Sequence, residues 1–494
     1  MLFNSLQFLL FFPVVALLYS VIPQRAKVYW LLAASYYFYM CWNARYALLL
    51  LFSTAVTYLS GILIAYGAKT TRMKKLWVAL SFCANLSILF FFKYSNFVFD
   101  SLRQAFAALH IQLHLPVIDV LLPVGISFYI FQALSYTVDV YRGDVACEKN
   151  FARYALFVSF FPQLVAGPIE RSGHLLTQIQ NAPKPSYAGV KSGLLLMLWG
   201  FFEKMILADQ AALVVDRVFA EYQSMNAVQI LFGVLLFALQ IYCNFGGYSH
   251  IAIGAAEVMG FSLMENFRQP YFAVSVQDFW RRWHVSLSTW FRDYLYIPLG
   301  GNRKGTARKY LNLMITFCVS GLWHGSAWTY VIWGGLNGAF QVVGGLTAPV
   351  RRRIKQALRV KETGWISGLW SRLVTFVLID FAWLFFRAES LDQALFMLRR
   401  VLTEFFASQL QAASFLLRAD ETASVRWLCM MAAALLVLFL ADLWRERWGG
   451  ARAWLLRQPW WVVSAVAIAG VCAVLVFGVY GDGYDAAQFV YFQF

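Results

Sequence analysis

Apolar segments long enough to cross a lipid bilayer recur along the whole sequence, and they constrain the fold more than any other feature. The hydrocarbon core of a bilayer is about 30 Å thick, and a helix of about 20 apolar residues crosses it. Of the 494 residues, 61% are hydrophobic and 13% are charged, whereas soluble domains usually have about 25% charged residues. The sequence therefore predicts an all-α, polytopic integral membrane protein without a large soluble domain.

The expected membrane helices number about 11 to 14, including short or re-entrant ones, and form one domain over residues 1–494. The expected spans are 5–22, 28–43, 46–66, 76–92, 117–140, 187–207, 227–245, 309–322, 327–347, 366–387, 424–443 and 459–480. Two shorter apolar stretches, 151–168 and 249–263, are expected to be re-entrant or interfacial. No basic segment precedes the first span, which we interpret as a retained helix rather than a cleaved signal.

Basic residues gather in short loops between the apolar spans, and this pattern accounts for a net charge of +16 without a nucleic-acid partner. Short basic loops of membrane proteins face the cytoplasm. By this rule 69–75, 351–355 and 445–457 are cytoplasmic, whereas 481–485 and the segment with Asp420 and Glu421 are outside. The predicted topology places both termini outside the cytoplasm.

His324 lies in an apolar segment, 317–335, that contains no Asp, Glu, Lys or Arg. An ionisable side chain is costly to keep at membrane depth and indicates a functional site by default. Imidazole also exchanges a proton near neutral pH, as acid–base catalysis requires. The alternative is a histidine that only forms a hydrogen bond between helices, and these residues alone leave both interpretations open.

The densest polar run, 277–303, combines Trp, Arg and His side chains. On a continuous helix, Asp278 and Arg282 are four residues apart and can form an ion pair, and Trp280 shares a face with His284. One interpretation is an amphipathic interfacial helix with Trp anchors and snorkelling Arg side chains. The other is a basic, aromatic lining for an anionic donor that enters from the cytoplasm.

Other catalytic chemistries have little support in the residues. His284 and His324 are too far apart in sequence for a local metal pair, and no Cys or His cluster accompanies them, so no metal site is predicted. No nucleophile elbow or Ser-His-Asp order stands out, which argues against a hydrolase triad. The seven cysteines form no Cys-x-x-Cys pair, and most lie in apolar spans, so we interpret them as core residues.

Several motifs together resemble the membrane-bound O-acyltransferase family, in the branch that includes the alginate O-acetylation membrane protein. The resemblance covers nearly the whole chain, and the 277–303 run together with the Leu-Trp-His-Gly motif is its most specific part. The matching stretches are Leu122–Tyr129, Tyr136–Gly143, Phe161–Ile169, 277–303, Gly321–Gly325 and Phe489–Phe494.

The resemblance implies a helical bundle around a central tunnel or funnel, and irregular backbone at membrane depth is tolerated only around such a cavity. It implies transfer of an acyl group, with acetyl favoured, from a cytoplasmic thioester such as acetyl-CoA, without a bound cofactor. The acceptor would be an extracytoplasmic polysaccharide, or an acetyltransferase- or esterase-like partner protein that passes the group on. The implied location is the cytoplasmic (inner) membrane of a bacterium.

The family's catalytic histidine matches His324, and a second polar position of the family matches His284. We expect His324 to act as a general base on the acceptor hydroxyl, with a covalent acyl-histidine as the alternative. His284 is expected to position the donor or to stabilise the developing oxyanion. The side chains expected to line the donor site are Trp280, Arg281, Arg282, Trp283, Trp323, Asn244 and His250.

The chain departs from the branch at residues 244–250. The branch commonly has Asp-Phe-Ser-Gly-Tyr-Ser-Asp there, whereas this chain has Asn244 and His250 at the two carboxylate positions. We predict that His250 has a supporting rather than a catalytic role. The intervening pair, Gly246 and Gly247, favours either a helix break or tight packing between helices.

Two other functions stay open on the residues alone. A glycan or lipid transporter or flippase would use buried His and Arg side chains as a proton relay or as headgroup contacts. D-alanyl transfer to teichoic acid would need a carrier protein as donor, and the motifs match the acetylating branch better.

Overall fold

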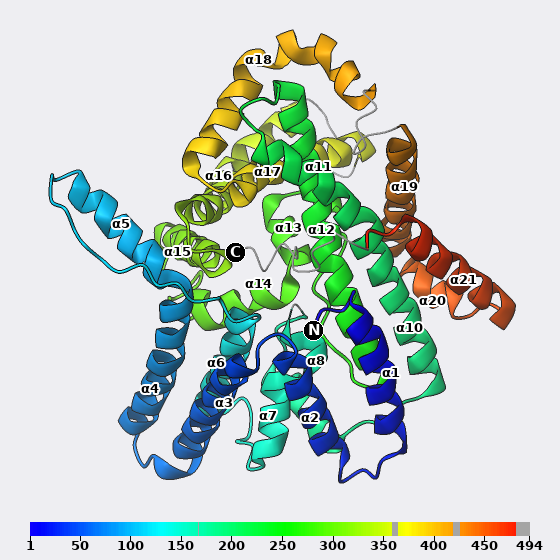
Figure 1. Ribbon diagram of the computed structural model, residues 1–494. Coiled ribbons are helices and arrows are strands. Elements are labelled where there is room, and N and C mark those ends of the chain that lie inside the picture. Colours follow the sequence, from blue (N-terminus) through cyan, green and yellow to red (C-terminus); the bar gives the residue numbers. More distant parts are fainter. Residues whose placement is uncertain (166, 358–363, 418–424, 481–494) are drawn as a thin grey trace. The chain divides into compact units, whose positions relative to one another are not determined.

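The computed structural model describes residues 1–165, 167–357, 364–417 and 425–480, and in these ranges the regular secondary structure is helical (Figure 1). This confirms the predicted all-α class. The described chain divides into two compact units, of which the first contains 1–197 and 249–264 and the second contains 198–248 and 265–480. The expectation of a single domain stays a prediction. The loop with Asp420 and Glu421, the tail 481–485 and the motif Phe489–Phe494 lie outside the described residues.

The first unit is built from helices that are mostly short. They are α1 (Leu6–Val21), α2 (Lys27–Met40), η1 (Ala44–Tyr46), α3 (Ala47–Ile62), η2 (Leu63–Gly67), α4 (Thr71–Leu89), η3 (Phe90–Tyr94), α5 (Ser95–Ala107), α6 (Ile126–Arg142), α7 (Phe151–Ser159), α8 (Phe161–Leu164), η4 (Ser172–Leu176), α9 (Thr177–Asn181) and most of α10 (Tyr187–Phe201).

Helix α6 is the core helix of the first unit, because every side chain from Ile126 to Thr137 is buried around its whole circumference. Helices α3 and α4 pack against it. Ser81 Oγ lies 3.3 Å from Thr137 Oγ1, and a β-carbon added to Gly61 would lie only 2.8 Å from the ring of Tyr136. Polar contacts and small residues of this kind hold helices together where no water competes.

The second unit carries the longer helices. They are η5 (Phe202–Ala208), α11 (Asp209–Ala220), most of α12 (Ala227–Val258), η6 (Pro270–Phe272), α13 (Val276–Arg282), α14 (Val285–Phe291), η7 (Arg292–Tyr296), α15 (Thr306–His324), α16 (Trp328–Ala357), α17 (Trp365–Arg387), α18 (Leu391–Leu417), α19 (Val425–Trp448), α20 (Ala451–Leu455) and α21 (Trp460–Phe477). Helices α15 and α16 make the most extensive helix pair in the described chain.

Six helical segments within the described ranges are long and apolar enough to cross a membrane. They are Ala44–Gly67, Thr71–Ala107, Ala227–Val258, Trp365–Arg387, Val425–Trp448 and Trp460–Phe477. Each coincides with a predicted span, so the chain is a multi-pass membrane protein. The larger number of membrane helices expected from the sequence stays a prediction.

One predicted span, 117–140, begins too early. The chain becomes helical only at Ile126, directly after Gly125, which adopts a left-handed conformation with φ of +71°. Pro123 has no backbone N–H to donate to a helix, and a β-carbon on Gly125 would lie 2.4 Å from the carbonyl oxygen of Leu164. A turn that only glycine fits therefore replaces the first part of the expected span.

The glycine pair at 246–247 does not break a helix, because α12 continues through it. A β-carbon on Gly247 would lie 2.7 Å from the carbonyl oxygen of Gly200 and 3.0 Å from the backbone nitrogen of Lys204. Of the two alternatives left open by the sequence, tight packing between helices holds.

Candidate active site

His324 is the last residue of α15, and only 4% of its surface is exposed. The helix ends there because Gly325 is extended, and the N–H of Gly325 still donates to the carbonyl of Gly321 at 3.3 Å. A β-carbon on Gly325 would collide with the ring of Tyr330 at 2.1 Å. Glycine at 325 therefore lets the chain turn beneath Tyr330 directly after the histidine.

A close crossing of α15 and α16 fixes the position of His324 relative to α16. A β-carbon on Gly321 would lie 2.2 Å from the carbonyl oxygen of Tyr330, and one on Gly334 would lie 2.2 Å from that of Phe317. The two glycines therefore allow backbone to approach backbone, as small residues do in membrane helix pairs. Because Gly321 is one turn before His324, this contact positions the imidazole.

His284 separates α13 from α14 and adopts a left-handed conformation, with φ of 42° and ψ of 54°. The expected continuous helix is therefore wrong, and Trp280 does not share a helix face with His284. A non-glycine residue in this region costs about 1–3 kcal/mol and persists only where its surroundings enforce it. Such strain is typical of a functional site.

Hydrogen bonds on both sides enforce this conformation. The N–H of Arg268 donates to the carbonyl of Arg282, and the N–H of Val285 donates to the carbonyl of Asn266, both at 2.9 Å. Ser286 Oγ also donates to Asn266 Oδ1 at 2.6 Å. The segment 266–268 thus runs beside His284 and holds the chain before and after it.

The two histidines meet inside the second unit. Their ring centroids are 6.3 Å apart, and the surface of His284 is 0% exposed. Aromatic rings enclose the pair, with centroids between 4.6 and 6.0 Å from one imidazole or the other. These rings belong to Phe245, Trp323, Trp333 and Phe386.

Burial sets the charge of His284. Loss of hydration lowers the pKa of its imidazole to about 3, so the ring is neutral at physiological pH. A neutral imidazole carries one N–H donor and one acceptor nitrogen. His284 can therefore donate a hydrogen bond to a polar substrate atom without placing a positive charge in the enclosure.

The predicted lining residues take different positions. Trp280 is buried and donates its indole N–H to Asn337 Oδ1 at 3.1 Å, and Trp283 is buried against Trp383. Arg281 is exposed, and Arg282 forms the predicted ion pair with Asp278 at 3.1 Å. A role of these side chains in donor binding stays a prediction.

The altered motif, residues 244–250, is divided between the two units: 244–248 belong to the second unit and 249–250 to the first. Asn244 is 2% exposed in the second unit, directly before Phe245, whose ring packs edge-on against His284 at 4.6 Å. Within the described chain, Asn244 Oδ1 is buried without a hydrogen-bond donor. His250 belongs to the first unit and is half-buried.

Sequence reasoning missed the wall of the enclosure. Trp333 and Trp383 stack with centroids 5.7 Å apart, and Phe386 packs against both. Trp333 lies in the apolar segment that contains His324, but its role carries no local signal. Trp383 and Phe386 come from α17, which reads as an ordinary apolar helix.

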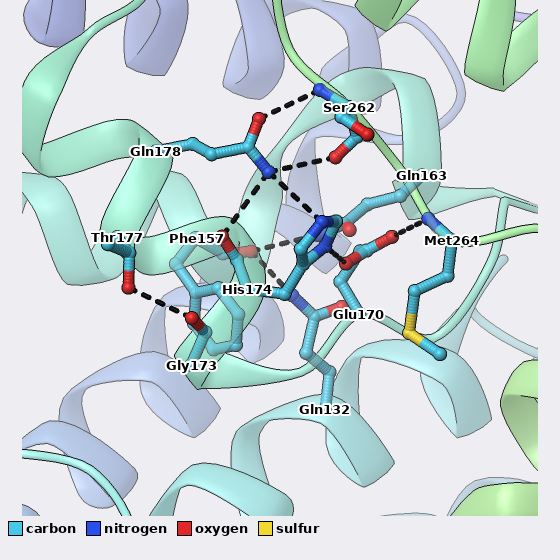
Figure 2. A network of polar contacts seen from close by, with 10 residues as sticks. All are labelled: Gln132, Phe157, Gln163, Glu170, Gly173, His174, Thr177, Gln178, Ser262 and Met264. Atoms are coloured by element: carbon cyan, nitrogen blue, oxygen red, sulfur yellow. Dashed lines mark hydrogen bonds and ion pairs between the residues drawn. The ribbon is translucent and has the colours of Figure 1, made fainter.

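A polar network in the first unit was also missed (Figure 2). Glu170 is fully buried, its Oε2 lies 2.7 Å from His174 Nδ1, and its other oxygen accepts the N–H of Met264. Gln178 continues the network by bonding both the N–H and the carbonyl of Ser262, at 2.8 and 2.9 Å. The i, i+4 spacing of Glu170 and His174 was the available signal.

Comparison with known proteins identifies the family of the chain. The model of the membrane-bound O-acyltransferase family matches residues 38–386, which include both histidines. The chain belongs to the membrane-bound O-acyltransferase family. The resemblance seen in the motifs is thereby confirmed, and this membrane-bound O-acyltransferase is an enzyme.

Relatives within the family differ in how much of the chain they match. A probable alginate O-acetylase, AlgI, of Pseudomonas putida is 40% identical over 80% of this O-acyltransferase and 79% of the relative. A peptidoglycan O-acetyltransferase of Helicobacter pylori is 34% identical over 81% and 79%, respectively. A teichoic acid D-alanyltransferase of Bacillus subtilis is 29% identical over 46% and 59%.

Proposed function

We propose that this O-acyltransferase moves an acetyl group from cytoplasmic acetyl-CoA to a hydroxyl group on the other side of the membrane. The acceptor is a polysaccharide, or an acetyltransferase- or esterase-like partner protein that hands the group on. The observation that carries the proposal is the meeting of His284 and His324 in a buried aromatic enclosure, within a chain of this family.

The relatives favour acetyl over D-alanyl transfer. Those matching about four fifths of the chain bear the names of O-acetylases of alginate and peptidoglycan, whereas the D-alanyltransferase matches 46%. Both acetylated polymers lie outside the cytoplasmic membrane, and acetyl-CoA is a cytoplasmic metabolite. Transfer therefore has to cross the bilayer, in keeping with a bacterial inner-membrane location and with basic loops on the donor side.

The proposed reaction uses His324 as a general base. Its neutral imidazole accepts the proton of the acceptor hydroxyl while the hydroxyl oxygen attacks the thioester carbonyl. The carbon–sulfur bond then breaks, and the leaving thiolate takes the proton from the imidazolium. The N–H of neutral His284 donates a hydrogen bond to the oxyanion that forms between these steps.

A covalent acyl-histidine is the alternative route for the same residues. In that case His324 attacks the thioester carbonyl, the thiolate leaves, and the acceptor hydroxyl removes the acyl group in a second step. Rapid denaturing gel filtration at neutral pH of the enzyme mixed with labelled donor and no acceptor distinguishes the two, because only the covalent route leaves label on the protein.

The decisive experiment measures donor consumption by the purified protein in lipid nanodiscs. We expect release of free CoA thiol from acetyl-CoA, stimulated by a soluble polysaccharide acceptor, with label appearing as O-acetyl ester. A glycan or lipid transporter would move substrate without releasing thiol. Absence of thiol release both with the polysaccharide and with the partner protein as acceptor contradicts the proposal.

A further inference from the structure

The C-terminal end of α19 carries two adjacent residues, Arg445 and Glu446, that bind the segments on either side of His284. Glu446 accepts two hydrogen bonds from Arg282, at 2.8 Å from Nη1 to Oε2 and at 3.1 Å from Nη2 to Oε1. Arg445 Nη2 donates to Glu265 Oε1 at 2.8 Å. The end of α19 therefore binds Arg282, which is the last residue of α13, and Glu265, which directly precedes the segment 266–268 beside His284.

These two ion pairs lie beside two paired segments, 265–268 and 282–285, which hold the strained His284 and which we call the hairpin. Arg282 is two residues before His284, and its carbonyl accepts the N–H of Arg268. Glu265 directly precedes Asn266, whose carbonyl accepts the N–H of Val285 on the far side of His284. Glu265 also pairs with Arg268 at 3.2 Å, which stiffens the short segment.

Arg282 is held at all three of its nitrogen positions. Its Nε donates to Asp278 Oδ1 at 3.1 Å, while its two terminal nitrogens bind Glu446. Asp278 in turn accepts the N–H of Val274 with its other oxygen at 3.1 Å. A bidentate guanidinium–carboxylate pair fixes direction as well as distance, which a lysine at the same place would not do.

We infer that Arg445 and Glu446 form a positioning clamp, which through Glu265 and Arg282 fixes the backbone at His284 and so the place of its imidazole opposite His324. This inference rests on the proposed function, because it assigns the clamp to the acyl-transfer site. Among the described residues, the side chains of Arg445 and Glu446 bond to Glu265 and Arg282, so the clamp acts on the reaction through the hairpin.

The clamp predicts a characteristic kinetic signature. Glu446→Ala and Arg282→Ala should each lower kcat by about 10- to 100-fold, as expected for a misplaced catalytic group, with little change in the KM for acetyl-CoA. A guanidinium that bound the donor phosphates instead would raise KM when removed. A twofold or smaller fall in kcat with a rise in KM overturns the clamp.

The double variant provides the second measure. Because both residues act through one contact, Arg282→Ala combined with Glu446→Ala should lose no more activity than the more affected single variant. Losses that multiply would show that the two residues act independently, and the clamp would be wrong. The matched control is Glu221→Ala, which removes an exposed carboxylate paired with Arg217 at i, i+4 and should leave kcat unchanged.

An activity-independent readout separates this inference from the proposed function. Hydrogen exchange of peptides covering 265–288 should be faster in Glu446→Ala than in the wild type or in Glu221→Ala, because the amides of Arg268 and Val285 lose protection. If the wild type releases no CoA thiol, the proposed function fails, whatever the exchange shows. If the wild type is active and Glu446→Ala matches it in both kcat and exchange, the clamp alone fails.

Discussion

His324 ends a helix of 19 residues, and its ring centroid lies 6.3 Å from that of His284, which ends none. The carbonyl end of a long helix favours a positive charge on a nearby side chain. His284, in contrast, is kept neutral by burial. In the proposed reaction the two imidazoles therefore have different roles: His324, at the carbonyl end of α15, receives the proton, and neutral His284 donates a hydrogen bond.

The first prediction concerns His324. His324→Ala removes the proposed general base, so the rate of O-acylation should fall by about 10²- to 10⁴-fold. The acyl content of the cell's polysaccharide, measured at matched levels of protein in the membrane, tests this. Near-wild-type acyl content would rule out His324 as the catalytic residue.

The second prediction concerns the crossing of α15 and α16. Gly321→Ala places a β-carbon 2.2 Å from the carbonyl oxygen of Tyr330, so the helices must move apart. We expect a loss of about 1–3 kcal/mol in stability, together with lower activity, because His324 shifts with α15. Thermal unfolding in detergent gives the first quantity.

Gly335→Ala is the matched control, since its β-carbon would meet only Cys318 Sγ at 3.9 Å, an ordinary contact. The close-packed crossing is the wrong explanation if the two alanine variants unfold at the same temperature.

Parts of this site could be predicted from the sequence because their signal is local. An imidazole in an uncharged segment marked His324, and the spacing of Asp278 and Arg282 predicted their ion pair, which the structure confirms. The membrane character could be predicted from composition, because repeated apolar segments of about 20 residues are typical of membrane-spanning helices.

Other parts depend on contacts between distant segments. The helix break at His284 is imposed by backbone hydrogen bonds to Asn266 and Arg268, so the helical spacing of the 277–303 run predicted a continuous helix wrongly. Trp383 joins the enclosure from α17, which in sequence is one apolar helix among many. No local pattern separates such a wall residue from a lipid-facing one.

The third prediction concerns topology. In a background without the native cysteines, single cysteines at Thr71 and Ala451 should react with membrane-impermeant thiol reagents only from the cytoplasmic side, because both begin helices within the basic segments 69–75 and 445–457. A cysteine at Asp482, outside the described residues, should react from the outside. Labelling of all three from one face would contradict the topology and the proposed direction of transfer.

The fourth prediction concerns the pH dependence of stability. The hydrogen bond to Glu170 raises the pKa of His174 above its ordinary value of 6.5. Protonated His174 therefore stabilises the fold fully below pH 6.5, and this contribution is lost as the pH rises through the raised pKa. It should amount to about 1 kcal/mol or less, because the His174 side chain is 42% exposed.

His174→Gln keeps a polar side chain without a titratable group. Its melting temperature should lie below that of the wild type at pH 6, and the difference should shrink towards pH 9. A constant difference across this range would mean that the charge of His174 contributes nothing.

The last prediction concerns His250, which stands where the family branch commonly has a carboxylate. His250→Asp should retain substantial acyl transfer, because it restores the usual residue of the branch. His250→Leu should lose more, since it removes the hydrogen-bonding group of a half-buried side chain and leaves its partner unsatisfied at a cost of about 1–3 kcal/mol. Both variants should be compared across pH and normalised to protein level, with His324→Ala as the reference for complete loss. If both fall to the level of His324→Ala, His250 is catalytic rather than supporting, and the assignment of proton transfer to His324 alone is wrong.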